Sequence, residues 1–163
     1  MSHRIGLIGF FDSVHSARQS LPEDCELTAL CDIREPLIQR CRAEDPSVFC
    51  TTDYHELAAR PDVDTVVTFT PNETHRDIAV AMLEGGKHVF IEKPMGINLQ
   101  QGREILAAEE RSGTYVGVDF EMQVIGLGPE IKAIIDSGEI GDVVHVEFDH
   151  ARGGWVHTTP SGE

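Results

Sequence analysis

The chain has 163 residues, enough for one domain with its own core and a short extension. Its formal net charge of −15 argues against nucleic acid and anionic membrane surfaces as partners, because Lys and Arg provide most of the affinity for both. It has neither an apolar run of the ~18–20 residues that span a bilayer nor the features of a signal peptide, so we expect a cytoplasmic protein. None of its four cysteines forms a Cys-x-x-Cys pair, and no metal site is predicted.

Short apolar runs alternate with amphipathic helical patterns along most of the chain. The apolar runs predict six buried strands, at residues 5–8, 27–31, 48–50, 63–69, 88–91 and 115–120. The amphipathic patterns predict five helices between them, at residues 13–21, 36–43, 53–59, 72–83 and 98–113. Asp53, Asn72 and Asn98 stand where helix N-caps are expected, and Gln101 completes the spacing of a capping box.

Strands that alternate with helices through short connections require right-handed crossovers and a parallel sheet covered on both faces. The predicted fold class is therefore α/β, with a Rossmann-type, mostly parallel, doubly wound sheet. Such a sheet binds its ligand at the carboxyl ends of the strands, near the point where the strand order reverses. We expect this domain to occupy residues 1–121.

The pattern changes beyond residue 121. Residues 130–137 predict a helix closed by Gly138, and residues 143–148 alternate like an antiparallel strand with one solvated face. A single strand cannot bury itself. We expect residues 122–163 to be the incomplete beginning of a second, α+β domain, with residues 142–163 either disordered in a monomer or paired across a homodimer.

Two residues at strand ends match the dinucleotide-binding fingerprint. Gly9 ends the first predicted strand, and Asp32 follows the second, 23 residues later. In that fingerprint an acidic residue about 20 residues after the glycine turn accepts hydrogen bonds from the adenosine ribose. The spacing therefore predicts a nucleotide site that includes Gly9 and Asp32.

Two motifs follow or span the next strands. Pro-Asn-Glu-Thr-His at 71–75 follows the fourth predicted strand, and Gly-Lys-His-Val-Phe-Ile-Glu-Lys-Pro at 86–94 spans the fifth. With Asp-Thr-Val-Val at 64–67 and Ser-Gly-Glu-Ile-Gly-Asp-Val at 137–143, these segments resemble the glucose–fructose oxidoreductase/inositol dehydrogenase (Gfo/Idh/MocA) family over roughly residues 4–150. The resemblance implies an enzyme that uses NAD(P) to oxidise a hydroxyl of a sugar, polyol or similar substrate, or to run the reverse reduction.

The resemblance also implies roles for individual residues. Lys93 would lie between nicotinamide and substrate, where it hydrogen-bonds the reacting oxygen and helps to move its proton. Glu92 would lie near the nicotinamide ribose, and the peptide bond before Pro94 is often cis in relatives. The remaining cofactor contacts expected beyond the first two strands are Thr70, Pro71, Asn72 and His75.

The loop after the first strand departs from the family pattern. Relatives have Gly-x-Gly-x-x-Gly, whereas this chain keeps only Gly9. Aligned from Gly9, Phe11 and Val14 replace the other two glycines; aligned instead on His15, the loop is two residues shorter. Cofactor contacts would then come from Gly9, Phe10 and Phe11. Asp12 adds negative charge where phosphates should lie, and Asp12 or Ser13 would cap the following helix. We therefore expect weakened dinucleotide binding.

The sequence leaves two functions open. One is an NAD(P)-dependent oxidoreductase, with NAD favoured because the Asp32 carboxylate would repel a 2′-phosphate, although Arg34 would pair with one. In this case the isolated chain is expected to be inactive, because relatives complete the substrate site with a second domain. The alternative is a non-catalytic nucleotide- or ligand-binding regulatory protein with a degenerate loop.

Overall fold

The computed structural model describes residues 2–9, 11–147 and 149. The chain divides into two compact units, residues 1–120 and 121–163. The first unit holds a parallel sheet of six strands in the order β3-β2-β1-β4-β5-β6. The strands are β1 (His3–Ile8), β2 (Cys25–Cys31), β3 (Phe49–Thr51), β4 (Thr65–Thr68), β5 (His88–Glu92) and β6 (Val116–Asp119).

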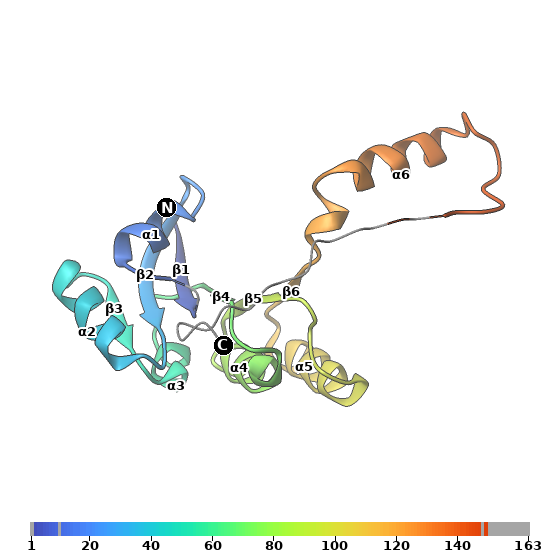
Figure 1. The fold of residues 1–163 in the computed structure, drawn as a ribbon. Helices are drawn as coiled ribbons and strands as arrows, with labels where there is room; N and C mark the ends of the chain where they lie inside the picture. The colour runs from blue at the N-terminus through green and yellow to red at the C-terminus, as the bar shows by residue number, and fades with distance from the viewer. Residues whose placement is uncertain (1, 10, 148, 150–163) are drawn as a thin grey trace, which may run out of the picture. The chain divides into compact units, whose positions relative to one another are not determined.

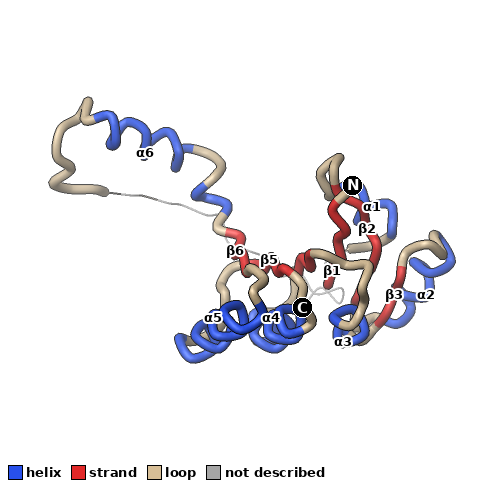
Figure 2. Tube along the Cα trace, turned by 180° about the vertical axis from the view of Figure 1, so that it is seen from behind, coloured by secondary structure: helices blue, strands red, loops and turns tan. Residues whose placement is uncertain are grey.

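Five helices cover the sheet, as the alternating pattern predicted. They are α1 (Val14–Gln19), α2 (Glu35–Glu44), α3 (Tyr54–Ala58), α4 (His75–Glu84) and α5 (Leu99–Ser112). One core lies between the sheet and α3, α4 and α5, which Figure 2 shows side by side beneath it. A second core lies on the other face, where α1 and α2 cover β1, β2 and β3 (Figure 1). The Rossmann-type, doubly wound α/β fold is thereby confirmed.

Most of the predicted helix caps form, with two differences. Asp53 Oδ1 accepts a hydrogen bond from the His55 amide at 2.8 Å, and Asn98 Oδ1 accepts one from the Gln101 amide at 2.9 Å. The Gln101 side chain reaches the amide of Ile97 rather than that of the cap residue, so the predicted capping box is displaced by one position. Asn72 caps no helix, because a 3-10 turn (Asn72–Thr74) precedes α4.

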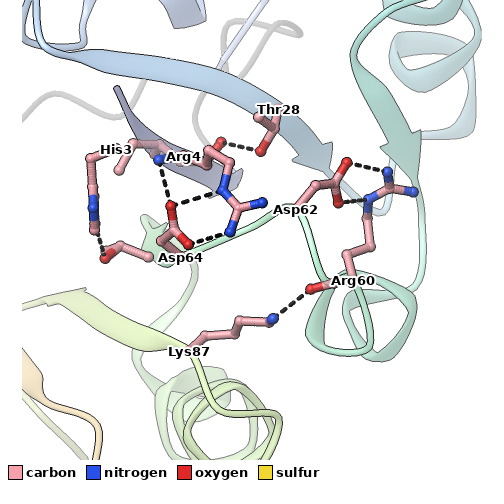
Figure 3. Close-up of polar contacts among 9 residues, drawn as sticks. His3, Arg4, Thr28, Arg60, Asp62, Asp64 and Lys87 are labelled. Atoms are coloured by element: carbon pink, nitrogen blue, oxygen red, sulfur yellow. Dashed lines mark hydrogen bonds and ion pairs between the residues drawn. The ribbon is translucent and has the colours of Figure 1, made fainter. Parts of the chain in front are cut away.

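The amino ends of β1, β4 and β5 are joined by charged side chains (Figure 3). The Asp64 carboxylate accepts from the backbone amide and Nε of Arg4, both at 2.9 Å, and from a terminal guanidinium nitrogen at 2.5 Å. These bonds hold the pKa of Asp64 well below its usual range. The buried Lys87 ammonium donates to the carbonyl oxygen of Arg60. This part of the Gly-Lys-His motif therefore supports the sheet at the edge opposite to the strands' carboxyl ends.

The second unit begins with a 3-10 turn (Glu121–Gln123) and continues into α6 (Leu127–Ser137), which ends at Gly138 with φ of +75°. The strand predicted at 143–148 does not form over 143–147, and residue 148 lies outside the described residues. The described residues of this unit form no strand, so residues 143–147 have no strand in this unit with which to pair. Residues 150–163, which include most of the predicted pairing segment, also lie outside the description. None of the described helices is long and apolar enough to cross a membrane.

Candidate nucleotide-binding cleft

A pocket of about 370 Å³ lies where the strand order reverses, between β1 and β4. Its walls are the residues that follow β1, β2, β3 and β4, together with Tyr54 of α3 and Ile78 of α4. It includes the predicted residues Gly9, Asp32 and Arg34. Parallel strands end at the same edge of a sheet, so residues far apart in the sequence meet at this pocket.

Gly9 brings the ends of β1 and β4 close together. Its φ is +75°, and a Cβ atom at this position would lie 2.8 Å from the carbonyl oxygen of Phe69. A larger residue would meet both backbone strain and a clash with backbone. The predicted glycine requirement therefore follows from a close approach between two strands.

Asp32 is a buried carboxylate that is paired with its neighbour. It accepts hydrogen bonds from the Arg34 amide at 2.9 Å and from two guanidinium nitrogens of Arg34 at 2.8 Å. These bonds lower the pKa of Asp32, so it is ionised at neutral pH. The carboxylate and the guanidinium line the pocket together.

A second pocket, of about 380 Å³, is lined by Phe69, Thr70, Asn72, Glu92 and Lys93. It shares Phe69 and Thr70 with the first pocket, so the two are neighbours along one edge of the sheet. The Lys93 ammonium is half exposed and lies 3.8 Å from a carboxylate oxygen of Glu92. The peptide bond between Lys93 and Pro94 is cis, as the resemblance implied.

His75 is completely buried rather than open to the cleft. Its Nε2 lies 2.9 Å from the carbonyl oxygen of Thr70, and its Nδ1 lies 2.8 Å from that of Pro94. The ring therefore links the loop after β4 to the loop after β5. The resemblance implies a direct cofactor contact for His75, whereas its burial gives it the geometry of a residue that positions Thr70 and Lys93.

The loop between β1 and α1 is tied into the protein. The Phe11 side chain is buried in the core beneath α1 and α2, and its carbonyl oxygen accepts from Arg34 at 3.2 Å. Arg40 donates to the carbonyl oxygen of Asp12. Phe11 thus belongs to the core, and it also borders a pocket of about 810 Å³ that Gly9 and Asp12 help to line. Phe10, the other predicted contact in this loop, lies outside the described residues.

The first turn of α1 has its amide donors satisfied within the chain. Ser13 and Ser16 form a reciprocal capping box, in which Ser13 Oγ accepts from the Ser16 amide at 3.0 Å. The Glu44 carboxylate, at the end of α2, accepts from the amides of Val14 at 3.1 Å and His15 at 3.0 Å. Glu44 was not predicted from the sequence, because this contact joins two helices and leaves no local spacing signal.

The cleft fits a dinucleotide at two of three places. The pocket at Asp32 offers an ionised carboxylate to a ribose, and the pocket at Lys93 offers polar groups to the reactive end. The amides of the first turn of α1, the helix that follows the fingerprint loop, are bonded to Ser13 and Glu44. Those amides are therefore not free to hold a diphosphate.

Comparison with known proteins identifies the family. The model of the oxidoreductase family with an NAD-binding Rossmann fold (GFO_IDH_MocA) matches residues 3–120. The chain belongs to this family. It is 33% identical to inositol 2-dehydrogenase of Salmonella typhimurium over 151 residues, which cover 88% of this chain and 44% of the relative. It thus spans less than half the length of that relative.

Other relatives agree. Inositol 2-dehydrogenase/D-chiro-inositol 3-dehydrogenase of Lactiplantibacillus plantarum is 32% identical over 88% of this chain and 42% of its own length. An NAD binding oxidoreductase from Klebsiella pneumoniae is 31% identical, with a TM-score of 0.72 over 86% of this chain and 40% of its own. A scyllo-inositol dehydrogenase from Lactobacillus casei, solved with NAD(H) and scyllo-inositol, shares the fold with a TM-score of 0.74 at 20% identity, over 87% of this chain and 43% of its own.

Proposed function

We propose that this chain supplies the nucleotide-binding half of an NAD(P)-dependent oxidoreductase acting on a hydroxyl or carbonyl group of a sugar or polyol. The observation that carries this proposal is the continuity of the Asp32 pocket with the Lys93 pocket through Phe69 and Thr70. This arrangement suits a ligand with a ribose at one end and a reacting group at the other. The inositol dehydrogenases among the relatives support the polyol class.

In this proposal the pocket at Lys93 would hold the nicotinamide end of the cofactor, which would supply hydride-transfer chemistry there. In the oxidation direction the neutral Lys93 amine takes the proton of the substrate hydroxyl as the carbonyl forms, and in the reduction direction the Lys93 ammonium donates it back. The Glu92 carboxylate lies 3.8 Å from the Lys93 nitrogen and helps to orient it. His75 fixes the backbone on both sides of the site. Thr70, Pro71 and Asn72 are the proposed cofactor contacts between these groups.

NAD is the favoured cofactor because Asp32 presents an ionised carboxylate to the ribose. Arg34 does not stand free to receive a 2′-phosphate, since its guanidinium is bonded to that carboxylate and to the carbonyl oxygen of Phe11. A 2′-phosphate would meet the Asp32 carboxylate directly beside this guanidinium. We propose that the remaining substrate contacts come from a second domain that begins near residue 122, and that this domain also provides a homodimer contact.

One observation favours a second candidate function. The amides of α1 are closed by Glu44, which suits a regulatory protein that binds a nucleotide weakly and catalyses nothing. Titration of the chain with NADH and NADPH, followed by cofactor fluorescence, separates the candidates. The oxidoreductase proposal expects saturable NADH binding that is weakened by Asp32→Ala and tighter than NADPH binding. Absence of saturable binding by both cofactors would favour the non-catalytic candidate.

A further inference from the structure

Thr70 lies at the junction between the two pockets of the cleft. It lines both the pocket at Asp32 and the pocket at Lys93, so a ligand that reaches from one pocket to the other passes this residue. In a dinucleotide the group that joins the two nucleosides is the diphosphate. The amide of Gly9, which lies close to Thr70, already donates to the carbonyl oxygen of Cys31 at 3.0 Å. That amide is therefore not free for an anion at the junction.

The Thr70 hydroxyl is the middle member of a chain of three threonine hydroxyls. Its oxygen lies 3.1 Å from Oγ1 of Thr68 and 2.8 Å from Oγ1 of Thr74. Thr74 donates to the Thr70 oxygen and shares the same proton with the carbonyl oxygen of Pro71, 2.7 Å away. The backbone of Thr70 is held as well, because its carbonyl oxygen lies 2.9 Å from Nε2 of the buried His75 ring.

Burial decides the direction of the bond between Thr68 and Thr70. Thr68 is completely buried, and among the described residues its hydroxyl has Thr70 Oγ1 as its one partner. A buried O–H group without an acceptor is costly, so Thr68 donates to Thr70. The Thr70 oxygen then accepts one hydrogen bond from each neighbour, which uses both of its lone pairs. Its own proton is left for a ligand, since Thr70 is only partly buried and borders both pockets.

We propose that the Thr70 hydroxyl is an oriented donor to the diphosphate of the ligand, and that Thr68 and Thr74 are positioning residues that keep it in the donor role. The inference rests on the nucleotide site of the proposed function and specifies a side chain that binds the phosphates there. A hydroxyl that donates to an anion forms a charge-assisted hydrogen bond, which is roughly twice as strong as a neutral one. The two bonds that Thr70 accepts polarise its O–H group and strengthen this donation.

The test is a calorimetric titration of the full chain with NADH, which carries a diphosphate, and with adenosine, which carries none. Thr70→Val removes the hydroxyl but keeps the shape of the side chain, and it should weaken NADH binding at least about tenfold while leaving adenosine unchanged. Thr70→Ser keeps the hydroxyl and should stay within about threefold of the parent. Thr114→Val is the matched control, because Thr114 is also a partly buried threonine in a hydroxyl pair, 2.8 Å from Ser112 Oγ, but precedes β6 at the opposite end of the strands. It should change neither affinity.

The positioning role is tested at Thr74. Thr74→Val leaves Thr70 in place but removes one of the two hydrogen bonds that its oxygen accepts, and it should weaken NADH binding about three- to fivefold. Thr74→Ser restores the hydroxyl and should restore the affinity of the parent, which a purely steric role would not require. Equal NADH affinities for these two variants would overturn the positioning role.

The remaining outcomes separate this inference from the proposed function. An NADH affinity that Thr70→Val leaves unchanged, or a loss that adenosine shares equally, would overturn the inference and leave the nucleotide site standing. Binding of adenosine without NADH would do the same. Failure of both ligands to bind the parent would overturn the nucleotide site and the inference together. If Thr70→Val unfolds the chain, the comparison of Thr74→Val with Thr74→Ser decides the question.

Discussion

The two halves of the cleft are built in opposite ways. On the side of β4 and β5, Lys93 and Thr70 border an open pocket, and the buried His75 ring holds the loops that carry them. On the side of β1 and α1, the protein's own side chains fill the corresponding positions. Phe11 enters the core, and Glu44 accepts hydrogen bonds from two amides in the first turn of α1.

This contrast shows that a family fold and an intact reactive end do not guarantee an intact cofactor loop. The half at β4 and β5 keeps the residues of the two family motifs, and its Lys93 is half exposed at a pocket. The half at β1 and α1 keeps the strand, the helix and Gly9, but its donors serve internal stability. The fold therefore indicates where a ligand would bind, whereas the function depends on which side chains and amides at that place are free to contact the ligand.

The largest expected effect concerns Phe11. If this residue belongs to the core, Phe11→Ala should lower the free energy of unfolding by about 3–5 kcal/mol, because a buried aromatic ring leaves a cavity. Chemical denaturation measures the change. Phe90→Ala is the control, since Phe90 is 39% exposed and should matter much less. Equal, small losses for both variants would show that Phe11 is a loop residue and that the two halves do not differ as described.

The next effect concerns the opposite half, where His75 bridges two carbonyl oxygens. His75→Ala should lower the free energy of unfolding by about 2–4 kcal/mol, because it removes a buried ring together with the N–H group that donates to a loop carbonyl oxygen. His55→Ala, at an exposed position on α3, serves as the control. A loss no greater than that of the control would mean that the loops carrying Thr70 and Lys93 are held by other contacts.

The sequence predicted the fold and much of one half of the cleft. Alternating apolar and amphipathic segments fix a parallel sheet, and a parallel sheet brings Gly9, Asp32, Thr70 and Lys93 to the same edge. Local rules of this kind cannot find Glu44, because its partners lie 29 and 30 residues away on another helix. They also did not predict that the Phe11 side chain packs in the core, since loop alignment says nothing about which way a side chain packs.

The predicted strand at 143–148 illustrates a different limit. Alternation of apolar and polar residues describes one strand, but a strand forms only when a neighbour supplies hydrogen bonds. The described residues of the second unit supply none, and residues 143–147 are irregular. Gly138 was predicted correctly to end the preceding helix, because its left-handed conformation, with φ of +75°, is a local preference.

A smaller effect concerns the edge of the sheet opposite to the cleft, where Asp64 is paired with Arg4. Asp64 has a lowered pKa because Arg4 donates to it, so its contribution to stability is present above its unfolded pKa of about 3.9 and is lost as pH falls through the folded value. Asp64→Asn should lower the Tm by a few degrees at pH 7 and flatten the loss of stability below about pH 4. Thermal unfolding from pH 7 to pH 2 measures this. An unchanged pH profile would mean that other carboxylates dominate the acid limb.

The smallest effect compares the reactivity of a thiol at the floor of the Asp32 pocket with that of a thiol nearer the protein surface. Cys31 ends β2 beside Asp32, and burial together with that carboxylate raises the pKa of its thiol to about 12. Because the thiolate is the reactive species, Cys31 should resist a thiol reagent at pH 8 in the native protein, whereas the partly exposed Cys25 should react. Mass spectrometry of labelled peptides identifies the modified site, and Cys25→Ser is the control that should leave almost no native labelling. Rapid labelling of Cys31 would show that solvent reaches the floor of the pocket, in which case the half of the cleft at Asp32 is looser than the half at Lys93.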